Sequence, residues 1–166
     1  MTAQRLAFAL CVLLLGAGVQ LQPAQAQTTD FGGIRADTSA PVEISADSLT
    51  IDQADGSAVF SGNVVVSQGA MRLAAALVRV EYGSDGQREI SRLLASGGVV
   101  LASGSDAAEA ESAEYTILSG TVVLSGNVVL TQGGNVLSGQ RLTVNLTTGT
   151  ATVEGRVQTT LQPGGN

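Results

Sequence analysis

The chain lacks His, Lys and Trp altogether, and its single cysteine is Cys11. Without His, and with no thiol after Cys11, it has no histidine general base and few nucleophile–base pairs. The usual nitrogen and sulfur ligands of zinc are missing as well. These absences favour a protein that is not an enzyme and that needs no metal or cofactor.

Basic charge is scarce. All eight basic residues are Arg, against fourteen acids, and the formal net charge is −6. A nucleic-acid-binding protein needs a basic face that displaces phosphate counterions. Because no cluster of Arg occurs, this composition excludes nucleic acid as an expected partner.

Aromatic residues make up 3% of the chain. Two carboxylates could in principle act as acid and base on a glycosidic bond, but a sugar-binding site usually offers aromatic stacking platforms. An interior poor in aromatic and rich in aliphatic residues suits acyl chains better than sugars. A β-helix polysaccharide hydrolase therefore stays only as an alternative.

The first 26 residues have the pattern of a secretory signal. Arg5 precedes an apolar run from Leu6 to Val19, and Ala24-Gln25-Ala26 has the small residues that signal peptidase prefers. We expect cleavage between Ala26 and Gln27, and hence a mature protein in the periplasm without a thiol, which fits an oxidising compartment. An uncleaved membrane anchor is the alternative. The expected organisation is a cleaved signal peptide at 1–26, a flexible lead-in at 27–40, one domain at 41–160 and a flexible tail at 161–166.

Alternating apolar and polar residues predict strands through most of the domain, because a period of two buries one face of a strand and wets the other. The pattern occurs at 41–45, 48–52, 78–81, 114–117 and 141–146. Gly-containing pairs at 55–56, 85–86, 97–98 and 133–134 predict turns or bulges between or within strands.

Two segments of the chain repeat. Residues 59–69 match residues 123–133 closely, each containing Ser-Gly-Asn followed by apolar residues and Gln-Gly, and weaker copies begin at Ser96 and Glu154. A period of about 30 residues is typical of stacked supersecondary units that bury their apolar faces against their neighbours. In each copy we expect the glycine to let the chain turn where a side chain would obstruct it.

Two groups of acids could be read as cation sites. Asp52, Asp55 and Gly56 resemble part of a calcium loop but lack its spacing and its final Glu, which favours a turn. The acidic run from Asp106 to Glu114 is interpreted as a solvated edge strand and loop, charged against unwanted pairing. A cation site is the alternative for that run.

These segments together resemble the OstA-like lipopolysaccharide transport family, the LptA family. The resemblance covers about 41–160 and depends on three stretches, at 41–49, 60–69 and 123–130. It implies an elongated, open, V-shaped β-jellyroll (β-taco) of stacked antiparallel strand repeats. It also implies that lipid A acyl chains lie in an apolar groove of a protein that bridges the inner and outer membranes for outer-membrane assembly.

The resemblance further implies partners at the two ends of the domain. One is an LptC-like protein anchored in the inner membrane, and the other is the periplasmic domain of an LptD-like outer-membrane protein. Unpaired strand rows at both ends also predict head-to-tail self-association. A secreted β-solenoid adhesin or scaffold, with its interior packed shut, is the alternative reading of the same repeats.

The candidate groove residues are the apolar members of the alternating strands. The sequence does not decide which residues face inward near Val65 and Val129, because each of these residues has apolar neighbours on both sides. The predicted lipid-binding residues are Val42, Ile44, Leu49, Ile51, Val64, Val66, Val78, Val80, Tyr115, Ile117, Val128, Leu130, Leu142 and Val144. Each of them could equally be ordinary core.

Overall fold

The computed structural model describes residues 28–29, 33–52, 54, 56–83 and 89–162. The predicted signal peptide, with its cleavage site at Ala26 and Gln27, lies outside these residues, as do the turn at 85–86 and the end of the predicted tail. Every regular element in the described residues is a strand, so the predicted all-β fold is confirmed. The described residues contain no helix of the length and apolarity that crossing a bilayer requires.

Most of the strands are long. They are β1 (Thr28–Thr29), β2 (Glu43–Ser45), β3 (Ser48–Ile51), β4 (Ala58–Gln68), β5 (Met71–Tyr82), β6 (Ile90–Ser103), β7 (Asp106–Thr116), β8 (Thr121–Gln132), β9 (Asn135–Asn145), β10 (Thr150–Glu154) and β11 (Gln158–Thr160).

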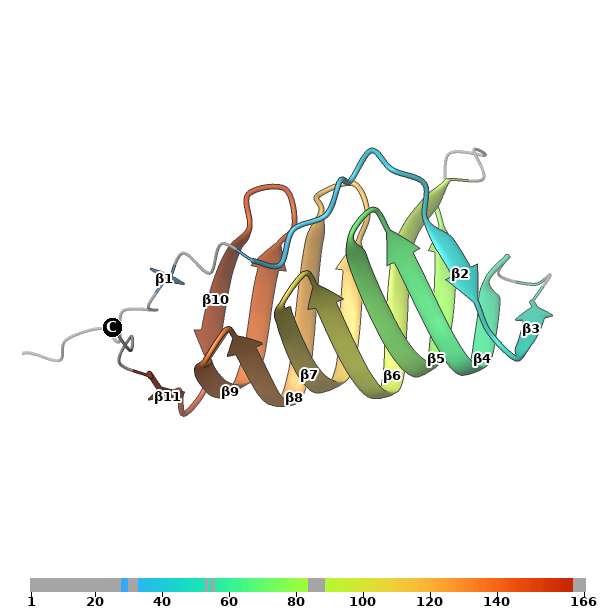
Figure 1. The fold of residues 1–166 in the computed structure, drawn as a ribbon. Helices are drawn as coiled ribbons and strands as arrows, with labels where there is room; N and C mark the ends of the chain where they lie inside the picture. Colours follow the sequence, from blue (N-terminus) through green and yellow to red (C-terminus); the bar gives the residue numbers. More distant parts are fainter. Residues whose placement is uncertain (1–27, 30–32, 53, 55, 84–88, 163–166) are drawn as a thin grey trace, which may run out of the picture.

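All pairings are antiparallel. Each strand from β4 to β9 pairs with the next one in sequence, and β1 pairs with the outer edge of β10. At one end β2 and β3 both pair with β4, and at the other β10 and β11 both pair with β9. Each of these two pairs therefore acts as one long strand broken in the middle. In the described residues the sheet does not close on itself, which agrees with the predicted open jellyroll (Figure 1).

A register shift interrupts neighbouring strands at their midpoints, for example between Ser61 and Val64 and between Ser125 and Val128. There each long strand bends, so that the sheet folds into two walls. We call the bend line the spine. Wall I contains residues 58–61 of β4 and the halves of the other strands that lie level with them. Wall II contains residues 64–68 of β4 and the remaining halves. The mouth is the edge opposite the spine, where the hairpins end.

The Ser-Gly-Asn repeats lie on the spine. Gly62 and Asn63 in β4 have φ of 79° and 45°, and Gly126 and Asn127 in β8 have 85° and 45°. These are left-handed conformations that glycine adopts freely and that Asn tolerates better than most residues. The glycines turn the chain where a side chain would obstruct it, as predicted, since a Cβ on Gly62 would meet Asp47 at 2.5 Å; the turn is a bend within a strand that continues on the other wall.

The acidic run from Asp106 to Glu114 is not an edge. It forms β7, which pairs with β6 on one side and β8 on the other. Ala108, Ala110 and Ala113 are buried on its inner face, while Glu109 and Glu111 are exposed on the outside. The acids alone suggested an edge, but the alternating alanines provide the small inner face of a central strand.

Candidate functional site

Apolar side chains form continuous rows along the inside of wall I. Residues paired across antiparallel strands point to the same face, so the register defines each row. One row contains Leu49, Phe60, Val78, Ala95, Ala113, Leu124, Leu142 and Val153. A second contains Ile51, Ala58, Val80, Leu93, Tyr115, Val122, Val144 and Ala151.

Wall II contributes a matching inner row. It runs through Ile44, Val66, Leu73, Leu101, Ala108, Leu130 and Leu137. Side chains from both walls belong to one buried cluster. The interior is therefore a single packed apolar core that runs the length of the molecule between the walls, and we call it the corridor.

Nine of the predicted groove residues are buried in this corridor. They are Val64, Val66, Val78, Val80, Tyr115, Val128, Leu130, Leu142 and Val144, each at most 2% exposed. Val42, Ile44 and Ile117 are partly buried and pack against the cluster. The faces left open by the sequence are now defined, since Val65 and Val129 point outward from wall II next to these buried residues.

Leu49 and Ile51 differ from the other predicted residues in exposure, at 51% and 64%. Both lie in the inward rows of wall I, but β3 is the last strand at that end, so no further layer covers them. The corridor thus has an apolar end at β3 that is open to solvent.

A polar rim replaces the apolar row where wall II reaches the mouth. Gln68 is 2% exposed, and its Oε1 accepts a 2.5 Å hydrogen bond from the Tyr115 hydroxyl across the interior. Burial raises the pKa of Tyr115 above its ordinary value, and the hydrogen bond to Gln68 opposes this. The phenol therefore stays protonated at neutral pH and acts as a donor.

The rim continues along the next two hairpins of wall II. Ser103 and Asp106 face each other in β6 and β7 and are 6% and 5% exposed. Gln132 Nε2 donates to Asp106 Oδ2 at 3.0 Å. Three polar side chains are thus held at the mouth beside an otherwise aliphatic interior.

Residues 33–42 lie along the mouth, and we call this segment the strap. Figure 1 shows it passing over the hairpin ends from β10 to β2. The lead-in predicted at 27–40 therefore packs against the domain over its last part. Ile34 is 4% exposed and belongs to the buried cluster, and Ala36 and Val42 pack against it.

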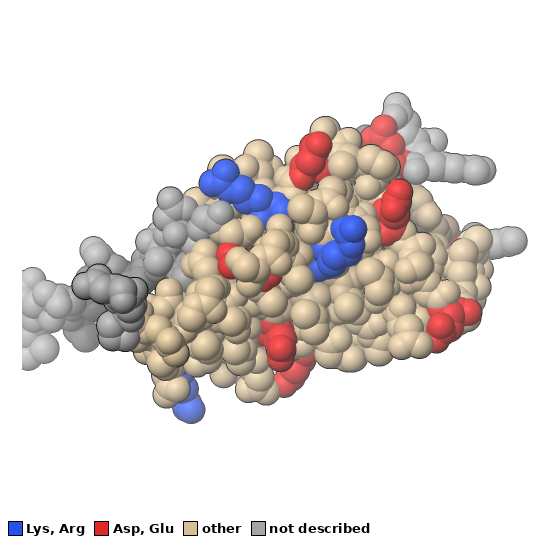
Figure 2. Space-filling model, in the orientation of Figure 1, with Lys and Arg blue, Asp and Glu red and all other residues tan. Residues whose placement is uncertain are grey.

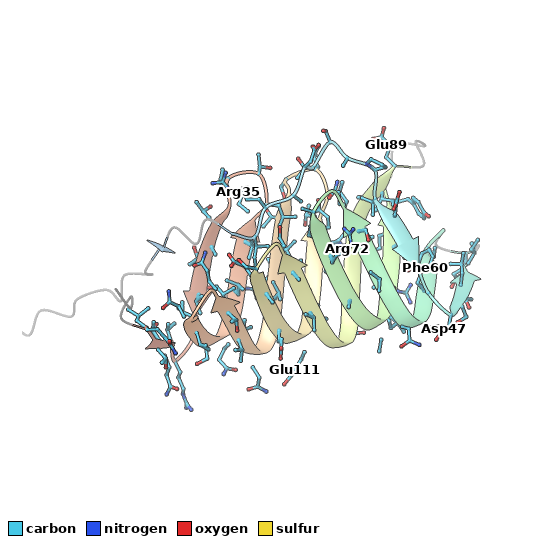
Figure 3. All side chains as sticks on the ribbon, in the orientation of Figure 1. Arg35, Asp47, Phe60, Arg72, Glu89 and Glu111 are labelled. Atoms are coloured by element: carbon cyan, nitrogen blue, oxygen red, sulfur yellow. The ribbon has the colours of Figure 1, made fainter. Side chains whose placement is uncertain are left out.

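The outer face of wall II is largely uncharged (Figure 2). Figure 2 shows this face with uncharged side chains covering most of it. Arg35 of the strap and Arg72 at the start of β5 lie near the mouth in Figure 3, whereas Asp47 and Glu111 lie along the spine. Two valines on the outer face of wall II, Val100 and Val136, are exposed by 40% and 38%.

The outer face of wall I carries the ion pairs. Arg92 in β6 contacts Glu81 of β5 at 2.7 Å and Glu114 of β7 at 3.1 Å. These two carboxylates raise the pKa of the exposed guanidinium. Arg92 thus links three neighbouring strands at the surface. The described residues contain no group of three or more potential metal ligands.

Comparison with known families shows which family the chain belongs to. Residues 43–150 match the model of the LptA/(LptD N-terminal domain) LPS transport protein family. The chain belongs to this family. It is 37% identical over 128 residues, 72% of this chain and 69% of the relative, to an uncharacterised protein of Rhizobium meliloti strain 1021.

The fold of this family member is also found in a solved structure. It is similar to LptH, the LptA-homologous periplasmic component of the lipopolysaccharide transport device of Pseudomonas aeruginosa, with a TM-score of 0.68. The similarity covers 77% of this chain and 99% of LptH at 21% sequence identity. The jellyroll predicted from sequence is therefore shared with a family member of known structure.

Sequence reasoning missed the strap and the polar rim. One signal was present, because Gln68 and Gln132 occupy the same position in the repeated eleven residues. A polar residue that recurs at an inward position of two apolar repeats indicates a specific hydrogen-bonding role. The strap itself has no periodicity, so its packing could not be read from pattern.

Proposed function

We propose that this protein binds lipopolysaccharide in the periplasm, holds its lipid A acyl chains in the apolar corridor and passes them toward the outer membrane. Family membership and the unbroken inner rows support this proposal. The single observation that carries it is the corridor, which runs from β3 to β10 in a sheet that stays open at the mouth.

The physical basis is the burial of hydrocarbon. Each buried methylene contributes about 0.8 kcal/mol, so several acyl chains would bind strongly to a fully enclosing site. Rows of Leu, Val and Ala provide a surface without polar groups that would fix one position along the corridor. A bound chain can therefore exchange one set of aliphatic contacts for the next as it moves. The proposal contains no catalytic step.

The ends of the module fit the proposed partners. In the described residues β1, β2, β3 and β11 each pair on one side only. An LptC-like anchored protein at one end and an LptD-like periplasmic domain at the other could add strands there through main-chain hydrogen bonds. A second copy of the chain could join in the same way, because the two ends differ and can meet head to tail.

A photo-crosslinking experiment tests the site. The photoreactive residue p-benzoylphenylalanine is placed at Tyr115 in one variant and at Val123 in another, and each purified protein is irradiated with purified lipopolysaccharide. Tyr115 is 1% exposed on the inner face, whereas Val123 lies on the outer face of the same wall. We expect a crosslink from Tyr115 and none from Val123.

The contrary results are equally specific. A crosslink from Val123 alone would place lipid on the outside of wall I and overturn the corridor as the binding site. Absence of any crosslink, together with absence of binding by sedimentation with lipopolysaccharide micelles, would favour the alternative of a scaffold with a permanently closed core.

A further inference from the structure

The strap joins the two walls at the mouth. From wall II, Ser103 Oγ donates to the carbonyl of Arg35 at 2.8 Å, and Gln68 Nε2 donates to the carbonyls of Thr38 and Ala40 at 3.2 and 3.0 Å. From wall I, the carbonyl of Leu146 accepts the amide of Ala36 at 3.2 Å. The strap therefore binds both sides of the opening.

The strap also packs closely against both walls. A Cβ at Gly33 would overlap the carboxylate of Asp106 in wall II, and one at Gly120 in wall I would meet Thr38 Cγ2 at 3.1 Å. Glycine at these two positions, one in the strap and one in wall I, thus leaves room for the strap between the walls. Ile34 fills the opening from outside, with its side chain in the buried cluster.

The attachment is nevertheless light. The strap has no strand pairing between residues 33 and 42, and Ile34 is its only side chain in the fully buried set. Segments with few buried apolar contacts open at a lower free energy than the core. The contacts that hold the strap are therefore separate from the strand pairing that holds the walls together.

We propose that the strap is a gate, which closes the corridor in the lipid-free protein and must leave the rim before acyl chains enter. This inference rests on the proposed function, since it names the regulation of the same corridor. Gln68 is the latch, because one side chain holds two strap carbonyls and is itself fixed by Tyr115. When only a fraction of the molecules is open, the apparent affinity for the ligand falls in proportion to that fraction.

A reversible disulfide tests the gate. The Cβ of Asp37 lies 3.5 Å from the position of a Cβ on Gly69, which is within the range for a disulfide. The variant Asp37→Cys/Gly69→Cys, with Cys11→Ser, can lock the strap to wall II when oxidised and free it when reduced. The probe is fluorescently labelled lipopolysaccharide, and its binding is followed by polarisation.

We expect the oxidised form to bind at least about tenfold more weakly than the same protein after reduction, because locking removes the open fraction. The single variant Gly69→Cys controls for strain at that residue, whose φ is 56°. Equal binding by the oxidised and reduced forms would overturn the gate while leaving the proposed function intact. Failure of the parent protein to bind the probe at all would overturn the proposed function, and the gate with it.

A second pair of variants avoids the strained glycine. Gln68→Ala removes the latch, whereas Thr131→Ala changes an exposed side chain on the outer face of wall II, away from the strap. We expect Gln68→Ala to bind the probe several-fold faster than the parent and Thr131→Ala to match the parent. Equal rates for all three proteins would show that Gln68 does not hold the gate and would overturn its role as latch.

Discussion

Asn127 donates a hydrogen bond from its side-chain amide to Glu111 Oε1 at 2.6 Å, and Asn63 makes the same bond to Asp47 Oδ2 at 2.8 Å. The two bonds lie on the spine at equivalent places in the repeat. In each, the Asn is the second of two left-handed residues at which a strand bends. A local turn conformation and a cross-strand bond are thus combined in a single residue type.

The first prediction separates these two roles. Asn127→Gly keeps the left-handed conformation and loses the bond, so it should lower the free energy of unfolding by about 0.5–1 kcal/mol. Asn127→Val loses the bond and also forces a β-branched residue to positive φ, so it should cost clearly more, by about 1–2 kcal/mol. Urea denaturation measures both, and the same substitutions at Asn63 provide a repeat. Equal effects of Gly and Val would show that the conformation contributes nothing.

The second prediction concerns two neighbouring glycines on the spine. Gly97 and Gly98 have φ of 86° and 83°, but a Cβ on Gly97 would meet Ala76 Cβ at 2.6 Å, whereas one on Gly98 would meet nothing within 4 Å. Gly98→Ala should therefore cost about 1–2 kcal/mol of strain alone. Gly97→Ala should cost about 1–3 kcal/mol more, because the two strands must move apart. Thermal and urea unfolding would contradict this if both variants lost the same stability.

The third prediction concerns pH. Burial raises the pKa of Tyr115 in the folded protein, while in the unfolded chain the phenol ionises near pH 10. The folded state therefore holds its proton more tightly, so this contribution to stability is complete below about pH 10 and is lost as pH rises through the folded pKa. Urea unfolding between about pH 8 and 11 should show a steeper decline for the parent than for Tyr115→Phe.

Tyr115→Phe should also be less stable than the parent at neutral pH. It leaves Gln68 Oε1 buried without its donor, at a cost of about 1–3 kcal/mol. Tyr82 is 41% exposed and present in both proteins, so it does not affect the comparison. Parallel pH profiles of the two proteins would show that the Tyr115 phenol does not drive the alkaline loss.

The fourth prediction concerns the end at β3. Ile51 points along an inner row but is 64% exposed, so Ile51→Glu should change stability by no more than about 0.5 kcal/mol. It should weaken head-to-tail association, because a neighbour joined there would bury the new charge. Leu118→Glu is the matched control, since Leu118 is 98% exposed in the β7–β8 hairpin, away from both ends.

Sedimentation velocity at rising concentration measures this association. The parent and Leu118→Glu should sediment faster as concentration increases, and Ile51→Glu should not. Removal of residues 158–166 takes away β11 and should have the same effect from the opposite end. Self-association that survives both changes would show that copies do not meet through their terminal strands.

The strands could be predicted from sequence because alternation reports burial directly. The segment at 141–146 is an example, with Leu142, Val144 and Leu146 buried and Arg141 exposed. The repeat at 59–69 and 123–133 also predicted stacked units correctly. What the pattern could not give was the bend, because a glycine between two apolar runs is typical of both a hairpin and a fold within a strand.

The candidate site was predictable in its apolar part only. Val78 and Val80 follow from periodicity. The run Val64–Val66 is apolar on both faces, and only the observed burial of Val64 and Val66 shows which side faces inward. The role of Gln68 depends on contacts with residues 28 and 30 positions earlier in the chain. Such long-range bonds leave no periodic trace.

The length of the corridor depends on how many strands lie between the broken strands at its two ends. At about 4.8 Å between neighbouring strands, the eight strand levels from β2/β3 to β10/β11 give a corridor about 34 Å long. The number of hairpins sets this length, whereas the positions of the spine glycines set the width of each wall. Inserting one hairpin would lengthen the passage by about 9.6 Å and leave its cross-section unchanged. The length of the corridor and the width of its walls are therefore set independently, and either can change in evolution without the other.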